Sequence, residues 1–321
     1  MSHWQPTACF SILKKRADIL QQIRHFFAER NVLEVDTPLL SSHTVTDPYV
    51  IGIPALFKQN GLAEKTVYLQ TSPEYAMKRL LASGSGSIFQ MCKAFRQGDL
   101  GRVHQPEFTM LEWYRLGFNH HDLMDEMDEL LKMILNTASA ERLTYAGLFQ
   151  KYCGINPHTA ALSELTQCAR EYHIALHVDA DEENSRDTWL SLLMTHHIEP
   201  QIGQEKPIFI YDFPVSQAAL ANIRDDENPP VASRFEVYFR QLELANGFHE
   251  LQNADEQKKR FVADNAYREK NNLPIIDIDE KFLAALTFGL PDCAGVALGV
   301  DRLMMIALNA TSIDEVVSFA W

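Results

Sequence analysis

The chain contains two segments of alternating apolar and polar residues that predict a pair of β-strands joined by a charged loop. Residues 88–96 (IFQMCKAFR) and 107–114 (EFTMLEWY) both alternate with a period of two, which is typical of strands. The loop between them contains Gly98 and Gly101, which indicate a mobile connection rather than a tight turn. Charged residues crowd into this loop and its flanks. The segment 95–115 is therefore predicted to be an antiparallel hairpin that carries a binding site.

The other predicted elements alternate without the regular order of a parallel βαβ sheet. Helices are expected at 13–30, 122–135, 162–172, 188–194, 254–271 and 301–308, and extended segments at 32–38, 207–213, 235–244 and 294–300. Asp301 is expected to be the N-cap of the last helix. Hairpin-like loops connect the best strands, as at the turn expected over 225–230. This order favours an α+β fold in which helices flank a mainly antiparallel sheet.

Composition and charge exclude several classes of protein. With 321 residues, 46% of them hydrophobic, the chain can bury a large core. Its five cysteines are scattered without a CxxC pair, which favours reduced thiols over disulfides or zinc. The sequence contains no run of about 18 apolar residues, so we expect a cytoplasmic protein that does not interact with a membrane. Its net charge of -14 opposes a broad nucleic-acid surface but not an arginine pocket for one nucleotide.

Three separated segments resemble the signature motifs of the class II aminoacyl-tRNA synthetases. Residues 32–40 (VLEVDTPLL) are similar to motif 1, residues 95–115 to motif 2 and residues 295–306 (GVALGVDRLMMI) to motif 3. The order and spacing of the three segments also match. The lysine branch of the class is the most similar, because the chain carries TSPEY at 71–75 and LELANGFHEL at 242–251. The resemblance implies the catalytic core of a class II synthetase.

Motif 1 begins within the first forty residues, so the resemblance implies one catalytic domain over residues 1–321 and no N-terminal OB-fold. Without that module no anticodon-dependent tRNA binding is expected. Such a shortened lysyl-type core resembles the elongation factor P lysine ligases. Ala297 supports this match, because the ligases have an alanine at this position and the synthetases normally have a glycine. The family uses ATP to activate (R)-β-lysine as an adenylate, and then joins it to a lysine ε-amine of elongation factor P. Motif 1 implies a homodimer.

The resemblance assigns the ATP site residue by residue. Adenylate formation needs a fixed cation at the α-phosphate, which matches Arg96, and Arg302 matches the γ-phosphate ligand; these two are the expected catalytic residues. Phe108 matches the ring that stacks on adenine. Gly299 lies where a side chain would block the nucleotide. The remaining expected ATP contacts are Gln97, Gly98, Gln105, Glu243 and Leu244.

Glu243 and Glu250 match the family's Mg²⁺ ligands. Their separation of seven residues places them on opposite faces of a straight strand, so a shared ion requires a bulge or turn, which Asn246 and Gly247 can supply. A substrate with two ammonium groups requires carboxylates and hydrogen-bond acceptors. The residues that match the family's substrate pocket are Ser72, Pro73, Glu74, Glu112, Tyr114, Asn246, Glu250 and Ala297.

Two positions depart from the family pattern and keep other functions open. Gly98 replaces the acidic residue that usually meets the adenine amino group, and Gln105 replaces an asparagine. One alternative is a stand-alone lysyl-type enzyme that aminoacylates RNA. Another is a regulatory paralogue without catalysis, which Gly98 supports and the presence of Arg96, Glu243, Glu250 and Arg302 opposes.

Overall fold

The computed structural model describes residues 4–58, 60–61, 63–174 and 185–321. The chain divides into two compact units, one formed by Met1–Phe118 with Gln252–Trp321 and the other by Asn119–Leu251. Each unit contains both helices and a mainly antiparallel arrangement of strands, as the α+β prediction requires. That the two units together form the single domain predicted from the sequence stays a prediction.

The first unit is built on four adjacent strands. In order across the sheet they are β1 (Leu33–Glu34), β5 (Ile88–Phe95), β6 (Glu107–Leu116) and β12 (Cys293–Gly299). β1 runs parallel to β5, whereas β5, β6 and β12 are antiparallel to one another. The predicted hairpin is therefore confirmed, with Ile88 opposite Tyr114 at its base and Phe95 opposite Glu107 near its loop.

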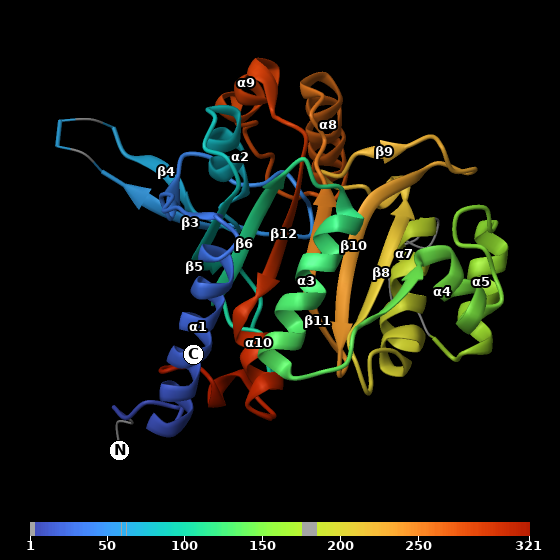
Figure 1. Ribbon diagram of the computed structural model, residues 1–321. Coiled ribbons are helices and arrows are strands. Elements are labelled where there is room, and N and C mark those ends of the chain that lie inside the picture. The colour runs from blue at the N-terminus through green and yellow to red at the C-terminus, as the bar shows by residue number, and fades with distance from the viewer. Residues whose placement is uncertain (1–3, 59, 62, 175–184) are drawn as a thin grey trace. The chain divides into compact units, whose positions relative to one another are not determined.

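Helix α1 (Phe10–Ala28) covers one face of this sheet (Figure 1). Its apolar residues at helical spacing, Ile23 and Phe27, are fully buried. The Phe27 ring stacks on Phe89 at 4.5 Å between ring centroids and meets the edge of Trp113 at 5.2 Å. Aromatic contacts of this kind add to the free energy gained from burial. They fix the helix on the face of the hairpin opposite to Glu112.

The rest of the first unit is a small sheet and a group of helices. The sheet contains β2 (Leu40–Ser41), β4 (Lys65–Leu69) and β3 (Ile53–Phe57) in that order. The helices are α2 (Glu74–Ala82), α8 (Ala254–Lys270), α9 (Glu280–Gly289), α10 (Val300–Ala307) and the 3₁₀ turn η4 (Ile313–Glu315). Helices α2 and α9 pack together through Tyr75 and Phe282, whose rings stack at 4.4 Å.

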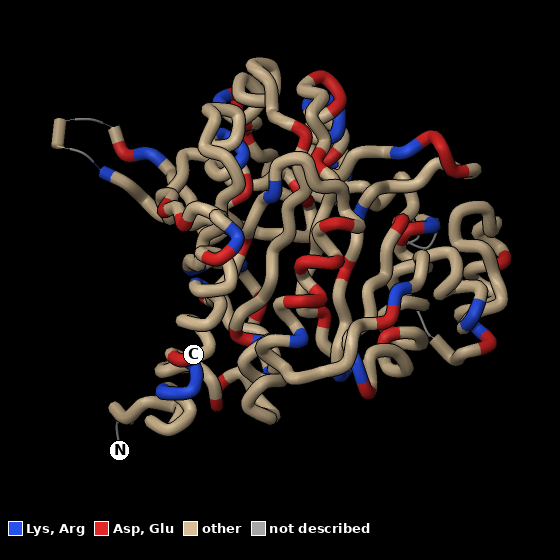
Figure 2. Tube along the Cα trace, in the orientation of Figure 1, with Lys and Arg blue, Asp and Glu red and all other residues tan. Residues whose placement is uncertain are grey.

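The second unit has its own strands and helices. Its strands are β7 (Glu141–Thr144), β8 (Ile208–Pro214), β9 (Ile223–Arg224), β10 (Val231–Phe239) and β11 (Leu242–His249). Its helical elements are α3 (His120–Leu135), α4 (Tyr145–Cys153), α5 (Leu162–Glu171), α7 (Arg186–Leu193), η1 (Met194–Ile198), η2 (Glu199–Gln201) and η3 (Val215–Gln217). Asn119 caps α3 in a capping box with Asp122. The acidic residues that follow along α3 are seen in Figure 2.

The strand predicted over 235–244 is wrong, because this segment contains a turn between two strands. β10 ends at Phe239 and β11 begins at Leu242, and the two residues between them, Arg240 and Gln241, have φ angles of 50° and 63°. Two consecutive residues in the left-handed region form the tight turn of an antiparallel hairpin. Neither residue is the glycine or asparagine that is typical of such a turn, so this turn could not be predicted from the residue types.

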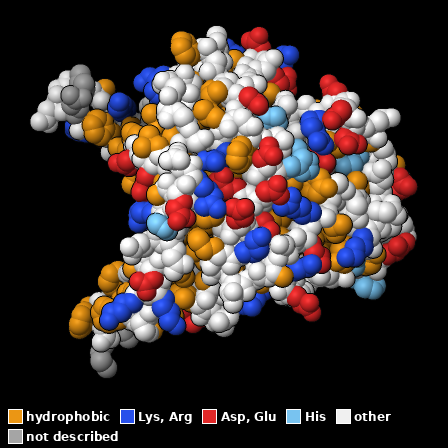
Figure 3. All heavy atoms as spheres, viewed as in Figure 1, with side chains coloured by type: hydrophobic (Ala, Val, Ile, Leu, Met, Phe, Trp, Pro, Cys, Tyr) orange, Lys and Arg blue, Asp and Glu red, His pale blue; other side chains and the backbone are white. Residues whose placement is uncertain are grey.

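Two surface properties agree with the composition. On the face shown in Figure 3, the coloured Lys and Arg side chains lie scattered among Asp and Glu side chains instead of forming a continuous basic strip. In the part of the chain that the structure describes, no helix is both long enough and apolar enough to span a membrane.

Replacing Phe27 by Ala should lower the free energy of unfolding by about 3–5 kcal/mol, because a fully buried ring leaves a cavity. The matched control is Phe10→Ala on the same helix, where the ring is 73% exposed, and it should change stability by less than about 0.5 kcal/mol. Urea unfolding of both variants measures the difference. Equal losses would show that α1 is not anchored through Phe27.

Candidate functional site

The register of β5, β6 and β12 brings many of the predicted site residues onto one face of the sheet. Directly opposed residues in an antiparallel pair point to the same side. Glu112 lies opposite Gln90 on β5 and opposite Ala297 on β12. We call the resulting surface the site face. Its members are Ile88, Gln90, Cys92 and Ala94 on β5, Phe108, Met110, Glu112 and Tyr114 on β6, and Gly295, Ala297 and Gly299 on β12.

Glu112 is a buried carboxylate in the middle of the site face. Its side chain is nearly inaccessible to solvent, and its Oε1 accepts a hydrogen bond of 2.7 Å from the Tyr114 hydroxyl. Burial and the charge of Glu112 together raise the pKa of the Cys92 thiol to about 12. On β12, Gly295, Ala297 and Gly299 present little or no side chain to the same face. The arrangement therefore suits an ammonium group bound against a fixed carboxylate.

The arginines expected to bind phosphate lie at the loop end of the hairpin. Arg96 follows β5, and its guanidinium carbon lies 5.3 Å from the centroid of the Phe108 ring. Arg302, in the first turn of α10, contacts the Nε2 atom of His104 through Nη2 and donates from Nε to the Val103 carbonyl at 3.3 Å. Burial, followed by the charge of Arg302, lowers the pKa of His104. His104 is thus held neutral next to Arg302 and can bind phosphate oxygens together with it.

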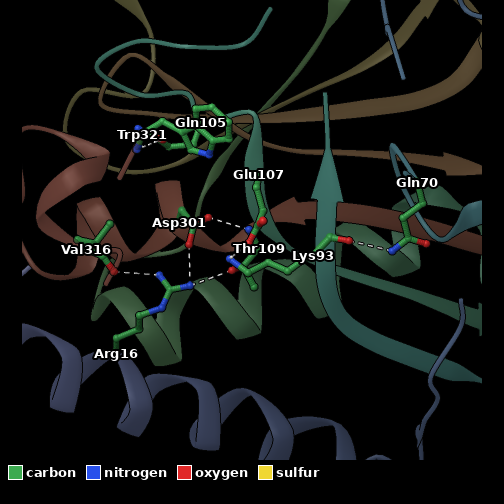
Figure 4. Close-up of polar contacts among 9 residues, drawn as sticks. All are labelled: Arg16, Gln70, Lys93, Gln105, Glu107, Thr109, Asp301, Val316 and Trp321. Carbon is green, nitrogen blue, oxygen red and sulfur yellow. Dashed lines mark hydrogen bonds and ion pairs between the residues drawn. The ribbon is translucent and has the colours of Figure 1, made fainter. Parts of the chain in front are cut away.

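Gly98 and Gln105 have structural explanations for their departure from the family pattern. Gly98 has a φ of +88°, a conformation that a side chain makes costly. Gln105 is buried, and its Nε2 donates to Asp314 Oδ1 at 3.0 Å. Its Oε1 accepts from the backbone NH of Trp321 at 3.0 Å (Figure 4). Both ends of its amide therefore hold the C-terminal segment. The backbone NH of Gln97 donates to the Ile51 carbonyl at 2.8 Å, which ties the loop to the segment after β2.

A buried ion pair joins helix α1 to the second and third motifs (Figure 4). Arg16 Nη2 lies 2.6 Å from Asp301 Oδ1 and also donates to Thr109 Oγ1 at 3.0 Å. The other carboxylate oxygen of Asp301 accepts from the backbone NH of Thr109 at 2.7 Å. The expectation that Asp301 is a helix N-cap is wrong, because Gly299 holds that position. Its carboxylate instead binds Arg16 and the backbone NH of Thr109. Asp301 thereby connects the strand residue that follows Phe108 to the helix that carries Arg302.

The segment before α2 gathers three further predicted residues. Pro73 is the N-cap residue of α2, and Ser72 Oγ accepts a hydrogen bond of 3.2 Å from the backbone NH of Glu74. Glu74 Oε1 lies 2.6 Å from the ammonium nitrogen of Lys78, a lysine that is only 1% exposed. A buried lysine is stable only when it is paired. Lys78 therefore fixes the Glu74 carboxylate in place.

In the second unit, a β-bulge allows Glu243 and Glu250 to face the same side, which a straight strand would not. Glu243 pairs with Tyr238 and Ala245 with Val237, so Leu244 is the additional residue of a bulge. One extra residue reverses the alternation of the strand, which allows two residues seven apart to point to the same side. The bulge lies at Leu244 rather than at the predicted Asn246 and Gly247.

Asn246 has a defined environment on the same strand. Its Oδ1 atom accepts from Arg234 Nε at 3.3 Å, and Arg234 is also paired with Glu236. Glu250 is buried and forms a single bridge with Ala221. The described residues contain no group of three or more His, Cys, Asp or Glu side chains suited to a metal. Two glutamates suit Mg²⁺, which retains several waters and takes phosphate oxygens as further ligands.

The family of tRNA synthetases class II (D, K and N) matches residues 3–321. The chain belongs to this class II synthetase family. Enzymes of this family use ATP, and its fold agrees with the predicted catalytic core. Three full-length relatives carry the name elongation factor P–(R)-β-lysine ligase. The protein of Vibrio cholerae is 55% identical over 99% of this chain and 98% of its own. The protein of Haemophilus influenzae is 52% identical over 100% of this chain and 98% of its own. That of Pseudoalteromonas translucida is 53% identical over 98% of this chain and 97% of its own.

Some of the predicted site residues belong to the first unit and the others to the second. The first unit contains three groups of these residues. Arg96 lies beside Phe108. Glu112 lies beside Tyr114 and Ala297, and Glu74 follows Ser72 and Pro73. Strand β11 of the second unit and the residue after it carry Glu243, Leu244, Asn246 and Glu250. The sequence analysis assigned no role to His104, Lys78 or Gln90. The i,i+4 spacing of Glu74 and Lys78 was the one available signal.

Replacing Arg16 by Gln should lower the free energy of unfolding by about 3–5 kcal/mol, because the buried Asp301 charge loses its partner. We also expect the KM for ATP to rise, since Asp301 positions both Phe108 and Arg302. Arg24→Gln is the matched control on the same helix, because its pair with Glu34 is exposed and contributes less than about 1 kcal/mol. Urea unfolding and ATP titrations measure both effects. An ATP KM that is unchanged in Arg16→Gln would contradict the positioning role.

Proposed function

We propose that this protein is a ligase that uses ATP to activate (R)-β-lysine and transfers the β-lysyl group to a lysine ε-amine of elongation factor P. The observation that carries the proposal is the buried Glu112 carboxylate, held by Tyr114 on a class II synthetase sheet. A buried carboxylate selects a substrate that brings its own positive charge. The names of relatives that are 50–55% identical supply the acceptor and the β-lysine.

Activation takes place at the loop end of the hairpin in this proposal. The carboxylate of β-lysine attacks the α-phosphorus of ATP, and pyrophosphate leaves. Arg96 neutralises charge that develops on the α-phosphate, while Arg302 and the neutral His104 hold the γ-phosphate. Phe108, next to Arg96 at 5.3 Å, stacks on adenine. The proposed ATP contacts also include backbone atoms of Gln97, Gly98 and Leu244. Gln105 and Gly299 complete the set.

The proposed Mg²⁺ ligands are Glu243 and Glu250, which the bulge at Leu244 allows to share one side of the strand. Bound Mg²⁺ would neutralise charge on the phosphates during the departure of pyrophosphate. Both glutamates present hard oxygen ligands. Glu243 is exposed and Glu250 is buried, so this chain supplies one accessible and one fixed carboxylate.

Recognition of β-lysine uses carboxylates for its two ammonium groups. We assign one ammonium to Glu112 and Tyr114, and place Glu74, Asn246 and Glu250 among the remaining contacts. Lys78 holds the Glu74 carboxylate in place, with its ammonium nitrogen 2.6 Å from Oε1. Ser72 and Pro73 shape the turn before Glu74, and the small Ala297 leaves space opposite Glu112.

In the second step, the acceptor amine attacks the carbonyl carbon of the adenylate. The C–N amide bond forms, the bond to phosphate oxygen breaks, and AMP leaves. The amine must first lose a proton, and with a pKa near 10.4 only about one in 2,500 is neutral at pH 7. Holding the amine next to the activated carbonyl compensates for this small fraction.

The remaining predictions belong to the same proposal. A homodimer is supported by the motif 1 segment, where Leu33, Leu39 and Leu40 are 55%, 39% and 44% exposed. A cytoplasmic location and the absence of anticodon-dependent tRNA binding fit a translation-factor acceptor. RNA aminoacylation and a non-catalytic regulatory role are less favoured, since full-length relatives are named as ligases.

Pyrophosphate exchange and intact-protein mass test the proposed function together. We expect (R)-β-lysine to support ATP–pyrophosphate exchange better than L-lysine, and elongation factor P to gain the mass of one β-lysyl group. A modified RNA with unmodified elongation factor P would favour the RNA alternative. Absence of exchange with either amino acid would contradict catalysis.

Replacing Arg96 by Ala should lower the exchange rate about a hundred- to a thousandfold, as expected for loss of charge stabilisation in the transition state. Arg102→Ala is a suitable control, because this arginine lies in the same loop but donates to the Thr311 carbonyl at 2.9 Å. Steady-state kinetics of both variants give the comparison. Equal activities would remove Arg96 from the catalytic residues.

A further inference from the structure

Gln90 is a buried glutamine whose side-chain amide makes no hydrogen bond. It lies on β5, is 2% exposed, and neither Nε2 nor Oε1 has a hydrogen-bond partner among the residues that the structure describes. The Gln90 amide is close enough to the Cys92 thiol to lower the pKa of the thiol. The two groups nevertheless lie outside hydrogen-bonding geometry. Burying an amide without partners destabilises a folded protein. Such a group calls for a functional explanation.

The position of Gln90 indicates what would satisfy it. It lies directly opposite Glu112 on the site face, so the two side chains are neighbours across the strands. Glu112 Oε1 accepts a hydrogen bond from the Tyr114 hydroxyl, and a hydroxyl oxygen is itself an acceptor as well as a donor. A primary ammonium group has three donors. Glu112, Tyr114 and the amide oxygen of Gln90 provide three acceptors of different character on one face.

The neutral charge of Gln90 fits this role. A second carboxylate opposite Glu112 would repel it in a poorly solvated setting. An amide oxygen accepts a hydrogen bond from the ammonium group without adding charge. The site face can therefore offer one ammonium group three acceptors while Glu112 contributes the negative charge at this point.

We propose that Gln90 is a substrate-binding residue whose amide oxygen accepts a hydrogen bond from the same substrate ammonium group that Glu112 binds. This inference rests on the proposed function. In the absence of substrate the amide is a cost to stability, and bound substrate removes that cost. Binding and stability should therefore respond in opposite directions when the amide is removed.

Gln90→Met tests this directly, because methionine has a similar length and no strong hydrogen-bonding group. We expect the KM for β-lysine in pyrophosphate exchange to rise about ten- to a hundredfold, the value of one hydrogen bond to a charged group. The KM for ATP should not change. The melting temperature without substrate should stay the same or rise by about 2 °C. Gln90→Leu is a second apolar variant in case methionine packs poorly.

Gln70→Met is the matched stability control. Gln70 is also buried and contacts β5, but its Nε2 donates to the Lys93 carbonyl at 2.9 Å (Figure 4). Its replacement should lower the melting temperature. If both Gln90 variants lower the melting temperature and leave the KM for β-lysine unchanged, Gln90 is a structural residue and the inference is wrong.

The two proposals can fail separately. If the wild-type protein exchanges with L-lysine and not with β-lysine, the proposed function is wrong. The comparison of Gln90→Met with wild type then uses L-lysine and still decides the role of Gln90. An increase in KM for the activated amino acid, with a stable variant, supports the inference in either case.

Discussion

The antiparallel register of β5, β6 and β12 determines which side chains share the site face with Glu112. Because β6 is paired on both sides, Glu112 is flanked by Gln90 and Ala297 at fixed positions. A shift of one residue would turn Glu112 towards α1 and bring Trp113 onto the site face. The stacking of Phe27 on Phe89 and its edge contact with Trp113 oppose such a shift. The packing of α1 therefore helps to specify the chemistry on the other side of the sheet.

Charge is arranged on this framework in two different ways. The carboxylates of Asp301 and Glu74 are each paired with a cation, Arg16 and Lys78, and so serve as fixed points of the structure. The Glu112 carboxylate is held by the Tyr114 hydroxyl. The hydroxyl fixes one oxygen of Glu112, as the two cations fix the other carboxylates. Hydrogen bonds and ion pairs therefore hold all three carboxylates in defined positions.

The local pattern of the sequence was sufficient to predict the hairpin over 88–96 and 107–114. Burial itself does not alternate there, because residues 110–114 are all buried on β6. The bulge at Leu244 and the turn at Arg240 and Gln241 were not, since their residues carry no turn signal and tertiary pairing sets them. Asp301 looked like a helix cap, but its partners lie far away in the sequence. His104, Lys78 and Gln90 acquire meaning only through neighbours that folding supplies.

In the proposed function, the site face binds the activated amino acid through Glu112. A crystal structure of the protein with a non-hydrolysable β-lysyl adenylate analogue tests this most directly. We expect an ammonium nitrogen within hydrogen-bonding distance of Glu112, with the adenine ring against Phe108 and a phosphate-like group near Arg96. An analogue bound elsewhere, or bound with its ammonium groups away from Glu112, would contradict it.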